Sequence, residues 1–119
     1  MNEVSVKTIR KAAMDLLARR EHSQKELLNK LKLRFQCEEM IIAVLQTLIE
    51  DNLLSDERFS ENYIRWRASR GYGPIRIRHE LFERGVADSI IEEYLNSNEG
   101  SWHEHIQSVW QKRFGEIAA

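Results

Sequence analysis

The chain has 119 residues, of which 42% are hydrophobic and 31% charged, with 18 lysines and arginines against 19 acidic residues. This length allows one modest domain or a short array of helical units with a real core, and the near-neutral charge gives no general affinity for nucleic acid. Cys37 is the only cysteine, so we expect no internal disulfide and a reducing, cytoplasmic setting. No apolar run approaches the roughly 20 residues that span a bilayer, and the N-terminus lacks a signal-peptide pattern, which predicts no membrane association.

Charge is unevenly distributed along the chain. Between Ile64 and Arg84, six arginines stand against Glu80 and Glu83, a local charge of +4. From Gly85 to the C-terminus, six acidic residues stand against one lysine and one arginine, a local charge of -4. This asymmetry indicates one surface suited to an anionic partner and another suited to water or to a basic partner.

The first half of the chain has the periodicity of three helices. The first expected helix covers 6–20, with Ser5 as its N-cap. A second begins at the capping box formed by Ser23 and Glu26, and a third covers 38–50. The residues expected on their buried faces are Val6, Ile9, Ala13, Leu16, Leu17, then Leu27, Leu28, Leu31, then Ile41, Leu45 and Leu48, with Ile42 and Ile49 beside them.

The second half repeats this organisation. A fourth helix opens at Ser55 and is broken by Gly71, and a fifth begins at Pro74 with Gly73 as cap and Gly85 as stop. A sixth covers 88–95, and a capping box at 101–104 opens a seventh. Their expected apolar faces are Phe59, Tyr63 and Trp66, then Ile77 and Leu81, then Ile90, Ile91, Tyr94 and Leu95. The spacing of Phe59, Tyr63 and Trp66 favours core packing over a stacking platform.

An internal repeat appears when the chain is shifted by 50 residues. Leu27 then meets Ile77, Leu31 meets Leu81, and the helices expected after them align as well. The sequence therefore predicts an all-α fold of tandem three-helix, helix-turn-helix-like repeats in an elongated, curved array. We expect a first repeat over 1–53, a second over 54–99 and the start of an incomplete third over 100–119.

One long motif resembles a known family. The segment 54–67, LSDERFSENYIRWR, followed by 71–86, GYGPIRIRHELFERGV, is similar to the central motif of RecX regulatory proteins. The resemblance implies a bacterial, cytosolic, non-enzymatic protein that docks on RecA and its single-stranded DNA filament. It implies restraint of filament growth, ATP hydrolysis, strand exchange and repressor cleavage, in recombination and in the SOS response. It also implies three tandem repeats, of which this chain has two and the beginning of a third.

Basic residues without an acidic residue three or four positions away are the expected contacts to RecA or DNA phosphate. The spacing assigns Arg65 to Glu61, Arg76 and Arg84 to Glu80, Lys30 to Glu26 and Arg19 to Asp15, as ordinary helix pairs. The candidates without such a partner on their own helix are Arg67, Arg70, Arg78, Lys25, Lys32 and Arg34. Arg65 and Arg76 belong to the same basic region, and Tyr72 is a candidate loop contact that either stacks on a base or packs locally.

Other kinds of site find little support in the sequence. The glycines of 71–74 could bring backbone amides to a phosphate, but a turn between two helices explains them better. His103 and His105 point to different sides of a helix, so we expect no metal. We find no catalytic set and no sign of a cofactor or a small-molecule substrate.

Two other functions remain open beside the resemblance. One is a helix-turn-helix factor that binds DNA directly and reads base edges. Weak DNA binding is also compatible with the RecA regulator. The other is a helical-repeat adaptor for a different protein, which the acidic C-terminal region would permit. Sequence-selective duplex binding without RecA would favour the first, and an unchanged RecA ATPase would favour the second.

Overall fold

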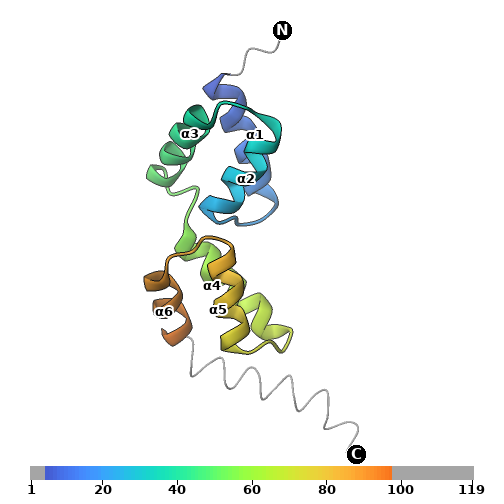
Figure 1. The fold of residues 1–119 in the computed structure, drawn as a ribbon, viewed down its shortest axis with the longest axis vertical. Coiled ribbons are helices and arrows are strands. Elements are labelled where there is room, and N and C mark those ends of the chain that lie inside the picture. The colour runs from blue at the N-terminus through green and yellow to red at the C-terminus, as the bar shows by residue number, and fades with distance from the viewer. Residues whose placement is uncertain (1–4, 98–119) are drawn as a thin grey trace, which may run out of the picture. The chain divides into compact units, whose positions relative to one another are not determined.

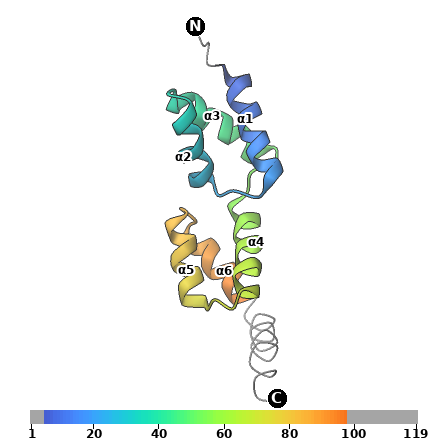
Figure 2. The ribbon, with the colours of Figure 1, turned by 90° about the vertical axis from the view of Figure 1, so that its right-hand side faces the viewer.

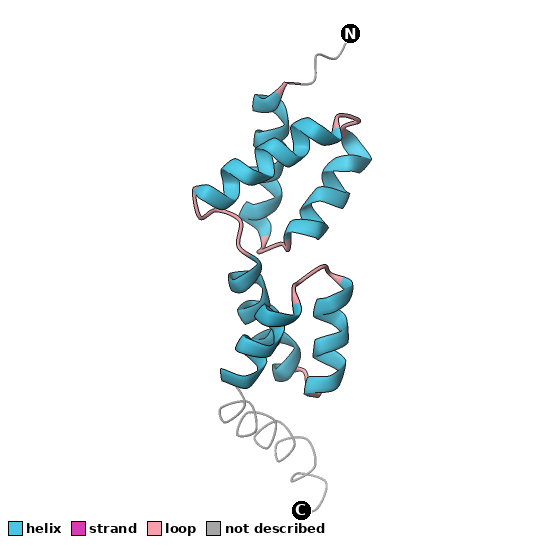
Figure 3. Cartoon of the chain, turned by 60° about the vertical axis from the view of Figure 1, so that its left-hand side comes forward, coloured by secondary structure: helices cyan, strands magenta, loops and turns pink. Residues whose placement is uncertain are grey.

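The computed structural model describes residues 5–97, and these residues form six α-helices and no strands (Figure 1, Figure 3). The helices are α1 (Val6–Arg19), α2 (Gln24–Arg34), α3 (Glu38–Glu50), α4 (Asp56–Ser69), α5 (Pro74–Glu83) and α6 (Asp88–Ser97). The all-α class and the six helices expected within this range are confirmed. The seventh expected helix, with His103 and His105, lies outside the described residues.

The helices repeat at a constant spacing. The first residues of α4, α5 and α6 follow those of α1, α2 and α3 by 50 positions each. The chain divides into two compact units between Phe59 and Ser60, so the first turn of α4 belongs to the first unit. The proposed domain bounds and the curved array of repeats remain predictions.

The expected caps define the helix ends. Ser5 Oγ accepts the Thr8 amide at 3.2 Å, and Ser55 Oγ accepts the Arg58 amide at 3.1 Å. The capping box of α2 is complete, since Ser23 Oγ accepts the Glu26 amide and a Glu26 carboxylate oxygen accepts the Ser23 amide, both at 3.1 Å. These bonds satisfy amides that have no partner within the helix, which is why these sequences start helices where they do.

In the first unit, α1, α2 and α3 pack against one another around one core (Figure 2). Leu54 completes this core from the segment that leads into α4. Asp56, the first residue of α4, is buried and accepts the amide of Gln24 at 2.8 Å, which links the start of α4 to the start of α2. The core residues are Ile9, Ala12, Ala13, Leu27, Leu31, Phe35, Ile41, Val44, Leu45, Leu48 and Leu54.

In the second unit, α5 packs against α6, and polar contacts from Glu80 join α5 to α4. Val86 is buried directly after Gly85, whose positive φ of 82° ends α5 as expected. The buried apolar residues of this unit are Tyr63, Ile64, Ala68, Ile77, Leu81, Val86, Ile91 and Leu95. The apolar pairs Leu27 with Ile77 and Leu31 with Leu81, which the 50-residue repeat aligns, are buried in both units.

Three of the apolar residues expected inside are exposed instead. Val6 is 47% exposed, Ile42 is 51% exposed and Trp66 is 50% exposed. Val6 is the first residue of α1, where the helix has just begun. Ile42 and Trp66 sit at the edges of wide apolar stripes, and only the middle of such a stripe meets neighbouring helices. The expectation that Trp66 packs in the core beside Phe59 and Tyr63 is therefore wrong.

Candidate functional site

The turn between α4 and α5 brings the basic region of the sequence together. Arg70 and Tyr72 donate their amides to the carbonyl oxygen of Arg67 at 3.0 and 3.2 Å, and Gly71 takes a φ of 87° that side-chain-bearing residues rarely adopt. Gly73 then caps α5, whose first residue is Pro74. The turn accounts for the glycine at position 71 through its positive φ, and it places Tyr72 between α4 and α5.

Glu80 is the centre of the polar contacts in this unit. Arg67 donates to both of its carboxylate oxygens, from Nε at 2.8 Å and from Nη2 at 2.7 Å. The Tyr63 hydroxyl donates to Oε1 at 3.0 Å, and Arg76 Nε contacts Oε2 at 3.4 Å. A two-point guanidinium–carboxylate contact fixes both side chains in one geometry, so Glu80 holds α4 and α5 together.

The protonation states in this cluster follow from its contacts. Burial by itself would raise the pKa of Glu80, but the hydrogen bonds from Arg67 and Tyr63 outweigh it and lower the pKa. Burial, and then the hydrogen bond to Glu80, raise the pKa of Tyr63 to about 12. The hydrogen bond to Glu80 raises the pKa of Arg67. At neutral pH the cluster is therefore a charged pair with a protonated phenol, an arrangement suited to holding the structure.

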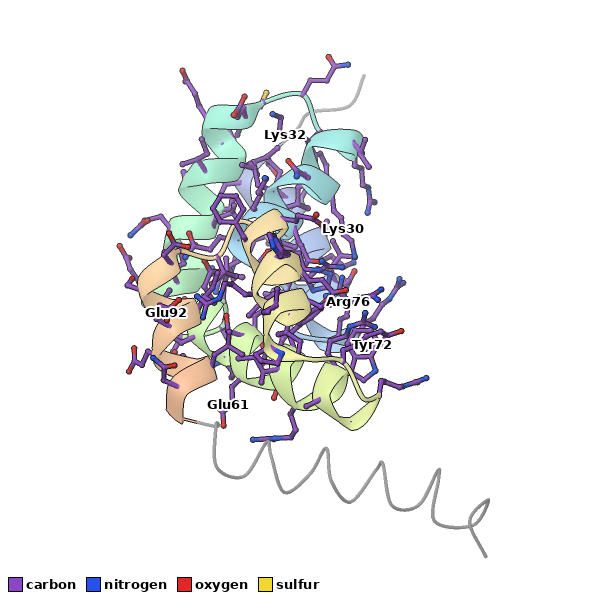
Figure 4. All side chains as sticks on the ribbon, turned by 60° about the horizontal axis from the view of Figure 1, so that its bottom comes forward. Lys30, Lys32, Glu61, Tyr72, Arg76 and Glu92 are labelled. Atoms are coloured by element: carbon purple, nitrogen blue, oxygen red, sulfur yellow. The ribbon has the colours of Figure 1, made fainter. Side chains whose placement is uncertain are left out.

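Tyr72 lies between two guanidinium groups. The guanidinium carbon of Arg67 is 3.7 Å from the centre of the Tyr72 ring, and that of Arg76 is 4.3 Å away. Tyr72 and Arg76 lie side by side in Figure 4, with Glu92 of α6 on the other side of the unit. Such cation–π contacts orient the ring. Of the two roles expected for Tyr72, local packing is the one that these contacts support.

The remaining arginine candidates of the second unit lie at separate places. Arg65 is 71% exposed and pairs with Glu61 at 3.0 Å, as the spacing predicted. Arg78 pairs with Glu92 of α6. Arg70 is exposed at the end of α4, and it has no ion pair with any residue in the range 5–97. Arg70 is thus the candidate whose charge is most available.

The candidates of the first unit are exposed residues of α2. Lys32 lies 3.7 Å from Glu38, and the Arg34 guanidinium lies 5.4 Å from the centre of the Phe35 ring. Lys25 is exposed near the start of the helix. These three belong to a different unit from Arg67, Tyr72 and Arg76, which are the candidates that the structure brings into contact.

Arg67 and Arg78 have acidic partners on other helices, which spacing along one helix does not reveal. Arg67 and Arg78 have no acid three or four positions away, yet they pair with Glu80 and Glu92 across helix boundaries. Arg67 is only 14% exposed, so its main contacts are internal. Lys30 was assigned to Glu26, but its ammonium group lies 2.9 Å from Nε2 of His22. Side-chain periodicity identifies neighbours within one helix only, which explains these misses.

Two large apolar side chains on α5 are exposed to solvent, and their exposure was not predicted from the sequence. Ile75 is 74% exposed and Phe82 is 62% exposed. Both follow from the helical spacing of the buried Ile77 and Leu81, since residues on the opposite side of α5 must face outward. A shallow, open hollow runs along the same helix from Gly73 to Glu83.

Residues 5–97 contain no group of three or more His, Cys, Asp or Glu side chains that could hold a metal ion. None of the described helices is long and apolar enough to cross a membrane.

Comparison with known proteins identifies the family. The family model for RecX, second three-helix domain, matches residues 55–95. A regulatory protein RecX from Pseudomonas putida is 49% identical over 106 residues, which cover 89% of this chain and 75% of that protein. A second regulatory protein RecX, from Pseudomonas syringae pv. tomato, is 47% identical over 110 residues and covers 92% of this chain and 71% of that protein.

Solved structures share the fold. The crystal structure of RecX from Lactobacillus salivarius superposes with a TM-score of 0.78 at 23% identity, over 95% of this chain and 75% of that one. The crystal structure of another regulatory protein RecX gives a TM-score of 0.76 at 22% identity, over 90% of this chain and 53% of that one. With two helical repeats, the matched motif in the second and close relatives that align over most of their length, the chain belongs to the RecX family of regulatory proteins.

Proposed function

We propose that the chain binds RecA and its filament on single-stranded DNA, and that it restrains the recombinase, ATPase and co-protease activities of RecA in recombination and in the SOS response. The observation that carries this proposal is the 49% identity with a regulatory protein RecX over 89% of the chain. The protein acts by occupying its binding site, in the cytoplasm, with no chemistry of its own and no cofactor.

The exposed arginines of the second unit are the proposed contacts to the filament. Arg70 has an available charge, and Arg65 and Arg76 are more than half exposed although each has an ion pair. Arg78 is 40% exposed. Guanidinium groups suit phosphates and carboxylates alike, so these residues fit either DNA or an acidic protein surface. Arg67 supports this surface through Glu80, and Lys25, Lys32 and Arg34 offer further cations on the first unit.

Measurement of RecA ATP hydrolysis on single-stranded DNA tests the proposal. We expect the rate to fall as the protein is added, because a bound regulator blocks the filament. Unchanged hydrolysis at saturating protein would reject the proposal and favour an adaptor for some other partner. Tight, sequence-selective binding to duplex DNA without RecA would instead favour a direct DNA-binding factor.

A double substitution tests the contact residues. We expect Arg70→Ala combined with Arg78→Ala to weaken filament binding and reduce inhibition, while leaving helicity intact. Lys11→Ala combined with Arg19→Ala, both exposed on α1, is the matched control, since it also removes two positive charges but from the first unit. Unchanged affinity of the double variant would show that the contacts lie elsewhere. Any direct binding to phosphate should also weaken as salt is added. Binding to phosphate releases counterions, and a higher salt concentration opposes that release.

A further inference from the structure

The outer side of α5 presents an apolar face to solvent. Ile75, His79 and Phe82 are all exposed, and their spacing of four and three residues places them on one side of the helix. Ile77 and Leu81, on the opposite side, are fully buried. A single exposed apolar side chain is ordinary, but two large ones aligned on one helix form a patch.

The first unit shows that the fold does not require this patch. The helices α2 and α5 start 50 residues apart and occupy the same place in their units. The counterparts of Ile75, His79 and Phe82 are therefore Lys25, Asn29 and Lys32, which are polar or charged and exposed. Because the same three-helix design is built with hydrophilic residues there, Ile75 and Phe82 contribute little to folding. Contact with another molecule explains them better.

The patch is bordered by cations that are specific to the second unit. Arg76 and Arg78 flank it, whereas the counterparts in the first unit are Glu26 and Leu28. Arg76 is 61% exposed and uses only Nε in its 3.4 Å contact with Glu80. Its terminal nitrogens can therefore donate to a further acceptor. A partner surface that is complementary to this patch has an apolar centre with carboxylates at its edge.

We infer that this face of α5, formed by Ile75, His79 and Phe82 between Arg76 and Arg78, binds a protein surface of that chemistry. The inference rests on the proposed function, so the surface is assigned to the protein component of the RecA filament. A protein is favoured over DNA because phosphates and sugars offer no apolar centre, and a base would stack on Phe82 but not on the aliphatic Ile75. Protein interfaces bury aliphatic and aromatic side chains together at their middle.

The first unit supplies the substitutions for the test. Ile75→Lys combined with Phe82→Lys introduces the residues that the same helix positions carry in the first unit, so the second unit should remain folded. The control is Leu33→Lys on α2, because Leu33 is 90% exposed and lies outside this face. Circular dichroism and thermal unfolding establish that both variants fold.

Binding is measured by surface plasmon resonance to RecA filaments assembled on oligo(dT) with a non-hydrolysable ATP analogue, and separately to oligo(dT) alone. We expect the dissociation constant of the double variant for filaments to rise at least about tenfold, as loss of central interface side chains typically causes. Binding to oligo(dT) alone should stay unchanged or become tighter, because two cations have been added. Leu33→Lys should bind filaments as the unsubstituted protein does.

The outcomes separate this inference from the proposed function. If the unsubstituted protein does not bind filaments, the proposed function fails and the inference fails with it. If the unsubstituted protein binds and the double variant binds equally well or more tightly, the inference alone is overturned, and tighter binding indicates DNA as the occupant. An equal loss with Leu33→Lys also overturns it, since the effect would then come from added charge at any place.

Discussion

Removal of the Tyr63 hydroxyl tests whether Glu80 joins α4 to α5. In Tyr63→Phe, the ring keeps its buried position, but the hydroxyl that donates to Glu80 at 3.0 Å is lost. A hydrogen bond to a charged acceptor contributes roughly 1.5–3 kcal/mol. Glu80 retains Arg67 and Arg76 as donors, so its charge is not left unpaired. We therefore expect a loss of about 1–2 kcal/mol in the free energy of unfolding.

The assay is urea denaturation followed by circular dichroism, with Tyr72→Phe as the control. The Tyr72 hydroxyl has no hydrogen bond to any residue in the range 5–97, and a phenylalanine ring would keep its contacts with the two guanidinium groups. The control should change stability by less than about 0.5 kcal/mol. Equal effects of the two substitutions would refute the role assigned to Glu80.

The pH dependence gives a second readout of the same contact. The pKa of Tyr63 is raised to about 12 in the folded chain, above its ordinary value of 10.0. The folded state therefore holds a proton that the unfolded state releases between these values, and stability from this group is lost as pH rises through that range. The difference in stability between the unsubstituted protein and Tyr63→Phe should shrink above pH 10. A constant difference would contradict the raised pKa.

Three further predictions concern the first unit and the repeat. Burial, together with the nearby Arg20 and Lys30 charges, lowers the pKa of His22 below its ordinary value of 6.5. Stability should therefore fall as pH drops below the pKa of His22 in the unfolded chain, because the unfolded state then binds the extra proton. His22→Gln should reduce this dependence in urea titrations at pH 5 and 7.5. Ser23→Ala removes the cap of α2 and should cost about 1 kcal/mol in the same denaturation assay, whereas a negligible cost would argue against the capping box. Leu27→Ala and Ile77→Ala, fully buried at matching positions, should each cost about 2–5 kcal/mol, and a small effect in either would show that its unit lacks a packed core there.

The helices within residues 5–97, their caps and the 50-residue repeat can all be recognised from local spacing in the chain. The bonds that cap a helix join residues three or four positions apart, as in Ser23 and Glu26, so they can be recognised from local spacing alone. The matched apolar positions, such as Leu27 with Ile77 and Leu31 with Leu81, are buried in both units because each faces the middle of a wide apolar stripe. The family motif, in the segments 54–67 and 71–86, is also local in the sequence, so it can be recognised without the tertiary structure.

Tertiary structure decided which of the charged and aromatic residues are available for contact. Arg67 pairs with Glu80, 13 positions away, because the turn at Gly71 brings α4 and α5 together, and spacing along one helix does not encode that meeting. The same holds for Arg78 with Glu92 of α6. Trp66 lies at the edge of its stripe, and only the crossing of the helices decides that it remains half exposed. Helical periodicity sets which side of its own helix a side chain faces. The packing of the helices against one another sets which residues that side chain contacts.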